Sequence, residues 1–365
     1  MSEAPPVATD PLPPGVTPVR PGFEIDTGAL DPYLREALPE YEGPLAVHQF
    51  EGGQSNPTYL LSTPGHRYVL RRKPPGRLLP SAHAVDREYR VISALGRTTD
   101  VPVPRAWLLC EDPSVAGTSF YVMDWVDGRI LRDPAMPGVP RDQRRAHGES
   151  MLAALACLHR VDYRAVGLGD FGRSGGYVAR QFSRWSGQYQ ADAAAGRVAA
   201  MDRLVEWLPT QMPATDETCI VHGDYRCDNV VFDPAGPQVA AILDWELATL
   251  GDPLVDFAYY VMIYRMPQAR LPGLLGKDLR ELGLPTEEEC VAQYCRLTGR
   301  ESVAGLDFYV AFNLFKLAAV LHGIRGRALR GNAASGRARD YAAMVEQVAE
   351  LGWQQAERAM RRGAG

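Results

Sequence analysis

Short apolar runs separated by turns that contain Gly and Pro predict β-strands in the first third of the chain. The expected strands cover residues 45–50, 58–62, 67–73 and 120–125. One helix is expected among them at 85–95, because Val85, Ile92 and Leu95 recur at helical spacing on one stripe. Glu88 lies on the same stripe, and a carboxylate on an inward face needs a partner.

After about residue 126 the spacing of the apolar positions becomes helical. Apolar stripes predict helices around residues 151–158, 308–319 and 341–348. Short apolar runs typical of strands interrupt this region at 219–221, 230–232 and 239–243. The pattern predicts an α+β architecture with a small sheet-rich lobe, a larger helical lobe and a β-hairpin insert at their junction. A cleft between two lobes is a common place for a ligand.

The first residues of the chain have a different composition. Residues 1–21 contain seven prolines and no hydrophobic periodicity. We therefore expect residues 1–24 to form an extended or disordered tail. The sheet-rich lobe should then span residues 25–125, and the helical lobe should span residues 126–362.

The composition argues against several classes of protein. Lys and Arg number 39 and Asp and Glu number 44, so the formal net charge is −5, which does not suit a chain that coats nucleic acid or an anionic membrane. The apolar stretch Ala311–Ile324 is interrupted by Asn313 and Lys316, so no membrane insertion is expected. No secretory signal is visible, and the six cysteines form no C-x-x-C pair. These features predict reduced thiols and a cytoplasmic location.

The most concentrated group of polar side chains is the loop 222–229, which lies between two predicted strands. The loop contains His222, Asp224 and Asn229, and Asp244 follows the next predicted strand. Two carboxylates and an amide at the ends of buried strands can converge on one point, and Mg²⁺ prefers such oxygen ligands. A plain β-turn can carry similar residues that satisfy backbone donors, but the full spacing favours a chemical role.

This loop resembles a known family. The text His222-Gly223-Asp224 with Asn229, followed by Asp244-Trp245-Glu246, is similar to the catalytic loop of aminoglycoside phosphotransferases. The resemblance covers about residues 25–360 and implies the bilobal protein-kinase-like fold of these small-molecule kinases. A closer resemblance is to a subgroup associated with acyl-CoA dehydrogenases. Members of this subgroup have sequence motifs similar to those at residues 53–58, 68–71, 78–83 and 176–185.

The resemblance implies roles for individual residues. Asp224 matches the catalytic aspartate, which accepts or orients the proton of the acceptor hydroxyl. His222 matches the histidine that braces the loop, and Arg226 belongs to the same catalytic group. Asn229 and Asp244 match the metal-binding positions, so ATP and Mg²⁺ are the implied cofactors. Trp and Glu follow Asp244 here, where protein kinases have Phe and Gly.

Nucleotide-binding positions are implied in the first lobe. Gly53, Ser55 and Asn56 lie in a turn whose backbone could approach phosphates. A plain hairpin turn would look the same. The backbone of Asp124 and Val126 matches the hinge segment that binds adenine.

The phosphate-binding cation is either Arg71 or Lys73, which share one face of the predicted strand 67–73. We favour Arg71, because it occupies the position at which protein kinases place a lysine, although Lys73 could supply the charge instead. Glu88 should pair with one of the two. Exposed strand charges are the alternative for both cations.

Two further motifs are expected to be structural, and one acidic residue is expected to support the site, with a plain helix N-cap as the alternative. Asp170-Phe171-Gly172 spells a protein-kinase metal motif but precedes the loop 222–229, so it should be a turn. His159 ends a predicted helix and should be a cap or a wall residue. Asp256 lies in an acidic segment that, in the family, braces the catalytic loop.

The implied partner is a small molecule with a hydroxyl group, and no nucleic acid is expected. Five arginines of the helical lobe would suit an acidic acceptor if they line the cleft: Arg180, Arg184, Arg325, Arg327 and Arg330. The subgroup resemblance implies a hydroxyacyl-CoA. Two alternatives stay open, an antibiotic kinase of the aminoglycoside type and a nucleotide-binding pseudokinase that regulates a partner.

Overall fold

The computed structural model describes residues 12–51, 56–76, 84–213, 217–331 and 338–363. The chain forms two compact units. Unit 1 contains the chain up to Gly128 together with Ala240–Ala248, and unit 2 contains the rest. The sequence placed the boundary near residue 126 but assigned the short segment to the helical lobe. One contact that holds this segment in unit 1 is the 2.8 Å hydrogen bond from the backbone N–H of Ile242 to the carbonyl of Pro102.

Unit 1 is built on a six-stranded antiparallel sheet with the order β1-β2-β3-β4-β6-β5. Its strands are β1 (Val16–Thr17), β2 (Ala46–Phe50), β3 (Thr58–Ser62), β4 (Arg67–Arg72), β5 (Ala106–Cys110) and β6 (Phe120–Asp124). Its helices are α1 (Thr27–Ala37), α2 (Val85–Thr98), α3 (Pro113–Ala116) and the 3₁₀ helix η4 (Trp245–Leu247). Arg71 of β4 lies opposite Thr58 of β3 and Tyr121 of β6, in the middle of the sheet.

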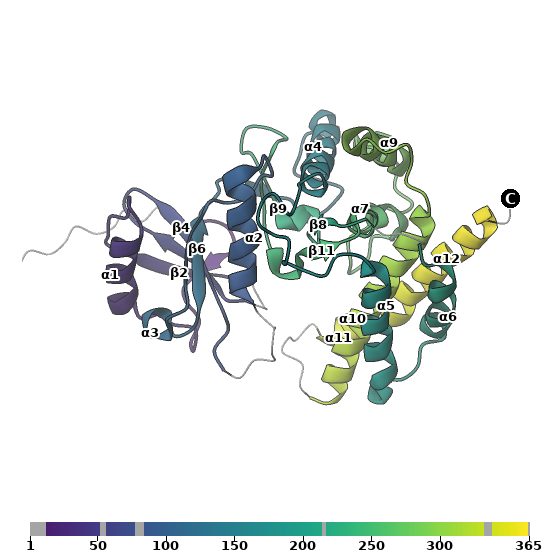
Figure 1. Ribbon diagram of the computed structural model, residues 1–365, viewed down its shortest axis with the longest axis horizontal. Helices are drawn as coiled ribbons and strands as arrows, with labels where there is room; N and C mark the ends of the chain where they lie inside the picture. Colours follow the sequence, from purple (N-terminus) through teal and green to yellow (C-terminus); the bar gives the residue numbers. More distant parts are fainter. Residues whose placement is uncertain (1–11, 52–55, 77–83, 214–216, 332–337, 364–365) are drawn as a thin grey trace, which may run out of the picture. The chain divides into compact units, whose positions relative to one another are not determined.

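The two faces of this sheet carry different side chains, because side chains alternate along each strand. Tyr59, Tyr68 and Phe120 point to one face, where they form a hydrophobic core with residues of α1 and α3. The opposite face carries Arg71 and Tyr121 and packs against α2 (Figure 1). The sheet therefore separates an apolar core from a face that carries charge.

Residues 12–24 differ from the extended or disordered tail that the sequence predicts. Strand β1 pairs with the edge strand β2, with Val16 opposite Phe50. Val16 is buried, and the backbone N–H of Arg20 donates to the side chain of Gln49 at 3.0 Å. The free edge of the sheet supplies these hydrogen-bond partners, and the sequence of the segment alone does not reveal them. The rest of the expected tail lies outside the described residues.

Unit 2 is mainly helical, as the spacing of apolar residues predicts. Its α-helices are α4 (Arg141–His159), α5 (Tyr177–Ala191), α6 (Ala199–Trp207), α7 (Pro253–Val261), α8 (Leu279–Leu282), α9 (Glu287–Thr298), α10 (Leu306–Leu329), α11 (Ala338–Ala342) and α12 (Val345–Gly363). Short 3₁₀ helices are η1 (Ala193–Ala195), η2 (Leu208–Gln211), η3 (Cys227–Asn229) and η5 (Met262–Arg265). The helix expected at 341–348 is therefore divided between α11 and α12.

The short strands of unit 2 form two antiparallel pairs. Strand β7 (Arg129–Ile130) pairs with β9 (Val230–Phe232), and β8 (Cys219–Val221) pairs with β11 (Thr249–Gly251). Strand β10 (Val239–Ile242) spans the boundary between the two units. The strands β8 and β9 hold the two ends of the loop 222–229.

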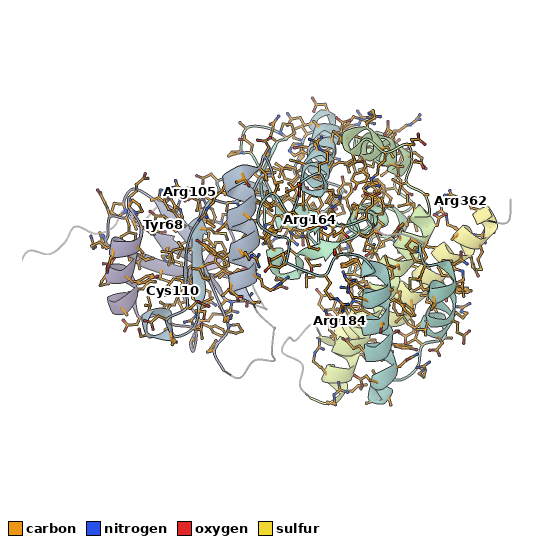
Figure 2. The ribbon with its side chains drawn as sticks, in the orientation of Figure 1. Tyr68, Arg105, Cys110, Arg164, Arg184 and Arg362 are labelled. Atoms are coloured by element: carbon orange, nitrogen blue, oxygen red, sulfur yellow. The ribbon has the colours of Figure 1, made fainter. Side chains whose placement is uncertain are left out.

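Helix α10 is the central helix of unit 2 and packs against α5, α7 and α12. Arg184 on α5 and Arg362 near the end of α12 are labelled in Figure 2. By length and composition α10 could cross a membrane, which differs from the expectation for the stretch 311–324, but 78% of its most apolar stretch is buried inside the protein. A buried core helix meets the same criteria, so this is weak evidence for a membrane span.

Replacing Arg265 should destabilise unit 2 strongly. This arginine is 3% exposed and contacts the carboxylates of Glu287 and Asp307 and the side chain of Gln355. Arg265→Ala leaves Asp307 in the interior without this partner, and breaking a buried pair costs about 3–5 kcal/mol. We expect the lower end of that range, about 3 kcal/mol, because Arg362 still lies 3.1 Å from Asp307. The measurement is urea unfolding followed by circular dichroism.

The control is Arg270→Ala. The partner of Arg270 is Asp340, and both side chains are 56% exposed, so this change should cost about 0–1 kcal/mol. Equal losses for the two variants would contradict the assignment of Arg265 as a buried structural cation.

Candidate functional site

The loop 222–229 joins β8 to β9 in unit 2, and η3 forms its last residues. Gly223 has a φ of +85°, in a region that favours glycine. His222 is fully buried, and its Nδ1 accepts a hydrogen bond from the backbone N–H of Asp224 at 3.2 Å. The imidazole thus supports the backbone immediately before the aspartate, which fits the bracing role that the resemblance implies.

Asp256 of α7 holds the same turn. Its Oδ2 accepts a hydrogen bond from the backbone N–H of His222 at 2.7 Å, and its Oδ1 accepts one from Gly223 at 2.9 Å. Nε2 of His159, at the end of α4, lies 3.3 Å from Oδ2. Burial acts to raise the pKa of Asp256, but the contacts with His159 and His222 outweigh it and the pKa is lowered. A buried, ionised carboxylate therefore organises the start of the loop.

The sequence motifs that were expected to be structural occupy such positions. Nδ1 of His159 lies 2.7 Å from the hydroxyl of Tyr294, so both ring nitrogens of this histidine contact the protein. Asp170 lies in a turn and Gly172 in a bend, and Phe171 is buried. The motif Asp170-Phe171-Gly172 is therefore a connection between α4 and α5.

Asp224 receives contacts on both carboxylate oxygens. Its Oδ1 accepts a hydrogen bond from the hydroxyl of Tyr259 at 2.5 Å, and its Oδ2 accepts one from Nδ2 of Asn229 at 3.1 Å. Nε of Arg226 lies 3.3 Å from Oδ1. These contacts fix the orientation of the carboxylate, and the side chain is still 24% exposed. A small molecule can therefore reach a carboxylate that is already positioned.

Asn229 has an oxygen to offer to a cation. Its Nδ2 donates both to Oδ2 and to the backbone carbonyl of Asp224, the latter at 2.9 Å. Its amide oxygen accepts no hydrogen bond from any described residue, and Mg²⁺ prefers such an oxygen ligand. The described residues contain no group of three or more His, Cys, Asp or Glu side chains that could hold a metal. The amide oxygen of Asn229 could therefore supply one ligand of a metal, and other oxygens would have to complete the set.

In unit 1, Arg71 lies among three carboxylates. Its Nε is 3.0 Å from Oε2 of Glu88, and its Nη2 is 2.6 Å from Oδ1 of Asp244 and 3.4 Å from Oε2 of Glu246. Burial acts to lower the pKa of Arg71, but the charges of Glu88 and the other neighbours outweigh it, so the pKa is raised. Arg71 is thus a permanent cation that links β4, α2 and the segment around η4.

Glu88 of α2 is the most enclosed member of this group, with 1% of its side chain exposed. Its Oε1 accepts a hydrogen bond from Nδ2 of Asn56 at 2.8 Å, and its Oε2 accepts one from the hydroxyl of Tyr121 at 3.1 Å. Burial raises the pKa of Glu88 to about 7, against the effect of the Arg71 charge. The carboxylate on the inward stripe of α2 thus has three partners, one of which is the expected strand cation.

Lys73, the other candidate cation, makes a different contact. Its Nζ lies 3.4 Å from Asp86, and the two side chains are 31% and 47% exposed. The structure therefore pairs Glu88 with Arg71, and Lys73 forms a surface pair. Gly53 and Ser55 lie outside the described residues.

Asp124 and Val126 lie at the end of β6 and just after it. The backbone N–H of Asp124 donates to the carbonyl of Arg105 at 2.9 Å. The N–H of Asp124 is therefore already engaged within the sheet. The side chain of Asp124 accepts a hydrogen bond from Trp107 at 2.6 Å, so this side chain supports the sheet.

Asp244 has an unusual backbone conformation. Its φ is +64°, and a residue other than glycine held in this region costs about 1–3 kcal/mol. The contact with Arg71 and the 3₁₀ helix η4 that follows hold the residue in this state. Strained residues of this kind cluster at functional sites.

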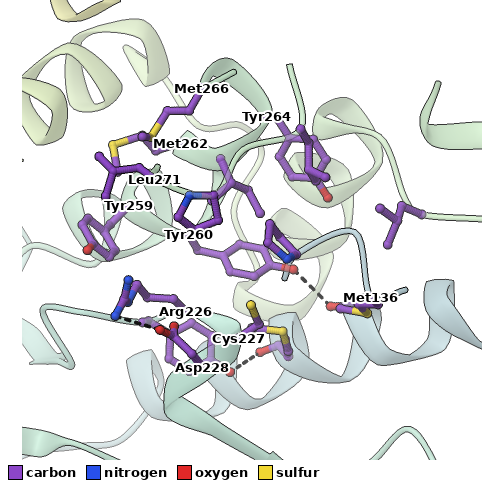
Figure 3. Close-up of a pocket in the computed structure, with 18 of the residues that line it drawn as sticks. Met136, Arg226, Cys227, Asp228, Tyr259, Tyr260, Met262, Tyr264, Met266 and Leu271 are labelled. Carbon is purple, nitrogen blue, oxygen red and sulfur yellow. Dashed lines mark hydrogen bonds and ion pairs between the residues drawn. The ribbon is translucent and has the colours of Figure 1, made fainter. Parts of the chain in front are cut away.

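A mostly apolar cavity of about 90 Å³ lies in unit 2 beside the loop 222–229. Its apolar lining includes Met136, Met151, Met262, Ile263, Met266 and Leu274. Its polar edge is formed by Arg226, Asp228 and Tyr259, which Figure 3 shows below and beside the methionines. Methionine side chains adapt to irregular apolar groups. The cavity therefore suits an apolar part of a molecule whose polar end is near Asp224.

Sequence reasoning missed two residues of this site, Tyr259 and Lys316. Nζ of Lys316 lies 3.4 Å from the carbonyl oxygen of Gly223 and 5.8 Å from the centroid of the Tyr259 ring. Burial lowers the pKa of Lys316. A signal was present for both: Tyr259 follows Asp256 by three residues on one helix, and Lys316 interrupts a long apolar stretch.

The arginines expected near an acidic acceptor mostly bind other parts of the protein. Arg325 pairs with Glu346, and Arg330 pairs with Asp192. Arg180 donates hydrogen bonds to backbone carbonyls of the segment that precedes α5. These three side chains therefore have structural partners.

Comparisons with known proteins place this geometry in context. The model of the phosphotransferase enzyme family matches residues 46–294. Acyl-CoA dehydrogenase family member 10 from Mus musculus is 43% identical over 343 residues, which is 93% of this chain and 32% of that protein. The chain spans less than half the length of the curated relatives that it matches.

Solved structures confirm the expected α+β, kinase-like fold. A protein of Ralstonia eutropha JMP134, assigned to the aminoglycoside phosphotransferases, is 43% identical with a TM-score of 0.84, over 92% of this chain and 99% of that one. An aminoglycoside phosphotransferase solved with ADP and hygromycin B is 14% identical with a TM-score of 0.57, over 90% of this chain and 99% of that one. The second likeness concerns the fold alone.

Replacing Asp256 should destabilise the fold in a way that depends on pH. Because the pKa of Asp256 is lowered, its carboxylate stabilises the folded state above the ordinary aspartate pKa of about 3.9. That stabilisation is lost as the pH falls through the folded pKa. Asp256→Asn should cost about 2–4 kcal/mol at pH 7, and the decline of stability below about pH 4 should become shallower. Urea unfolding at several pH values measures both effects.

Asp278→Asn provides the matched control, because Asp278 is an exposed N-cap of α8 that accepts a hydrogen bond from Glu281. Asparagine caps helices about as well as aspartate, so the change should be a few tenths of a kcal/mol. An Asp256→Asn variant that keeps both its stability and its acid sensitivity would contradict the bracing role.

Proposed function

We propose that this chain, which belongs to the phosphotransferase enzyme family, is a kinase that transfers the γ-phosphoryl group of ATP to the hydroxyl of a small molecule. The observation that carries the proposal is the environment of Asp224. Its carboxylate is held by Tyr259 and Asn229 on opposite oxygens, and Asp256 fixes the turn that precedes it. Phosphoryl transfer depends mainly on positioning and on the neutralisation of charge, and a preorganised base of this kind serves the first need.

In the proposed reaction the oxygen of the acceptor alcohol forms a bond to the γ-phosphorus. The bond between that phosphorus and the bridging oxygen of ADP breaks. Asp224 accepts or orients the proton that the alcohol loses, and His222 and Arg226 keep the loop and the carboxylate in place. No covalent intermediate with the protein is needed.

Asn229 and Asp244 are the residues that would hold Mg²⁺. The amide oxygen of Asn229 has no hydrogen-bond donor among the described residues, and Asp244 is a carboxylate in a strained conformation, so both fit a hard cation. When bound, Mg²⁺ would neutralise charge on the phosphates of ATP. Arg71 holds Asp244 through its ion pair, and Glu88 and Asn56 hold Arg71 and its surroundings.

We further propose that the acceptor is a hydroxyacyl compound, such as a hydroxyacyl-CoA. Two observations support this substrate class. The curated relatives are named as acyl-CoA dehydrogenase family members, and an apolar cavity adjoins the loop that carries Asp224. An aliphatic chain fits such a lining, whereas a polycationic aminoglycoside would need acidic groups. A cytoplasmic location suits the six cysteines, all of which are free thiols.

The direct test is a thermal-shift assay with ATP and Mg²⁺, followed by detection of phosphorylated product by mass spectrometry. The acceptor panel contains hydroxyacyl-CoAs and aminoglycosides. Phosphorylated hydroxyacyl-CoA supports the proposal, and phosphorylated aminoglycoside would assign an antibiotic kinase. Binding of ATP with neither transfer nor slow hydrolysis would instead indicate a pseudokinase.

Asp224→Asn should lower the rate of transfer by roughly 10²–10⁴-fold, the range for general acid–base assistance. The amide keeps hydrogen-bonding groups in place but cannot take up the proton, so stabilisation by ATP and Mg²⁺ should persist. Initial rates of ADP formation with a saturating acceptor measure the effect. Asp233→Asn, in the loop that follows β9, should retain the full rate. A variant at Asp224 with more than about half of the wild-type rate would remove this residue from the mechanism.

Asp244→Asn should raise the concentration of Mg²⁺ needed for ATP-dependent stabilisation by roughly tenfold or more. Removal of divalent cations with EDTA should abolish the stabilisation in the wild-type protein. The control is Glu246→Gln, because Glu246 also contacts Arg71 but is not proposed as a ligand. Equal Mg²⁺ dependence in the wild type and in Asp244→Asn would exclude Asp244 as a metal ligand.

A further inference from the structure

Lys316 lies on α10 next to the turn that carries Asp224. Its ammonium group faces the carbonyl oxygen of Gly223 at 3.4 Å and the ring of Tyr259 at 5.8 Å from the centroid. The hydroxyl of the same tyrosine donates to Asp224 at 2.5 Å. Tyr259 therefore contacts both the cation and the proposed base, and all of these groups belong to unit 2.

The contacts of Lys316 do not satisfy its charge. No carboxylate of a described residue lies within ion-pair distance of its Nζ. The bond to the carbonyl of Gly223 is longer than the usual range for an N–H···O hydrogen bond. Lys316 is partly buried, and burial of an ammonium group is unfavourable. Burial lowers the pKa of Lys316, although the charges of Asp256 and Asp224 act in the opposite direction. A purely structural position on α10 would be filled at less cost by an apolar side chain, like those of Phe315 and Leu317 beside it.

We propose that Lys316 binds the acyl oxygen of the acceptor, either the carbonyl oxygen of a thioester or the carboxylate of a free hydroxy acid. This inference rests on the proposed function. The acceptor hydroxyl would meet Asp224, the acyl oxygen would meet Lys316, and the aliphatic part would occupy the apolar cavity, which Leu317 also lines. Lys316 would then determine which alcohols are accepted, without taking part in the transfer of the phosphoryl group.

The test compares the wild type with Lys316→Met, which removes the charge, and with Lys316→Arg, which keeps it. Three acceptors of equal chain length are used: a hydroxyalkanoyl-CoA, the free hydroxyalkanoate, and a diol without an acyl oxygen. Lys316→Met should raise the KM for the acyl acceptor by roughly 10–100-fold, the effect of losing a hydrogen bond from a charged group. The KM for the diol, the KM for ATP and the slow hydrolysis of ATP should stay within about twofold of wild type.

Two comparisons separate the alternatives. The first comparison is between the CoA thioester and the free acid. The acyl acceptor of the protein is the one that is phosphorylated and whose KM rises in Lys316→Met. Lys316→Arg should recover part of the preference for the acyl acceptor over the diol. Lys277→Met, at a lysine of the segment that precedes α8, should match the wild type and controls for the loss of a charge as such.

Several results would overturn the proposal. An equal rise in KM for the diol would show that Lys316 does not recognise the acyl oxygen. A matching fall in ATP hydrolysis would show that it contacts the phosphates instead. If thermal denaturation shows that Lys316→Met does not fold, Lys316→Gln, which also removes the charge, takes its place. An unchanged ratio of the KM values for the acyl acceptor and the diol in that variant would exclude the role. Absence of transfer to any of these alcohols by the wild type would overturn the proposed function itself.

Discussion

The candidate site depends on the burial of one negative charge. Asp256 lies in the interior of unit 2 with 2% of the residue exposed, and a buried carboxylate costs several kcal/mol unless it is fully paired. Its partners are the imidazole of His159 and the backbone N–H groups of His222 and Gly223. Because those two N–H groups directly precede Asp224, their hydrogen bonds to Asp256 hold the turn before Asp224 in its observed conformation. The direction in which the loop 222–229 leaves this turn is set in the same way.

In unit 1 the buried charge that must be paired is positive. Arg71 lies in the middle of a sheet and is surrounded by Glu88, Asp244 and Glu246. The buried guanidinium of Arg71 needs carboxylate partners. Helix α2 supplies Glu88, and the segment after β10 supplies Asp244 and Glu246. The left-handed backbone of Asp244 is held by this charge network. In both units, therefore, a fixed charge organises the segment that carries the proposed chemistry, and the surrounding fold keeps that charge paired.

The sequence was sufficient for features with local causes. Strands β3, β8 and β9 begin and end where the apolar runs predict, because turn residues delimit each of them. Helix α1 was not predicted, since it contains Pro32 and a weak apolar stripe. The sequence favours Arg71 over Lys73 only by its position in the strand, because the pairing with Glu88 depends on how α2 docks on the sheet. Tyr259 and Lys316 could not be placed beside Asp224 for the same reason, as packing between helices decides which distant residues meet.

The central claim is that this chain moves a phosphoryl group from ATP to an alcohol. The most direct measurement uses ATP labelled with ¹⁸O in its γ-phosphate and follows the label by ³¹P nuclear magnetic resonance in the presence of Mg²⁺ and a hydroxyacyl-CoA. The account predicts that the label appears in a phosphate monoester of the acceptor. Label that stays in ATP, or that enters only inorganic phosphate, would contradict it.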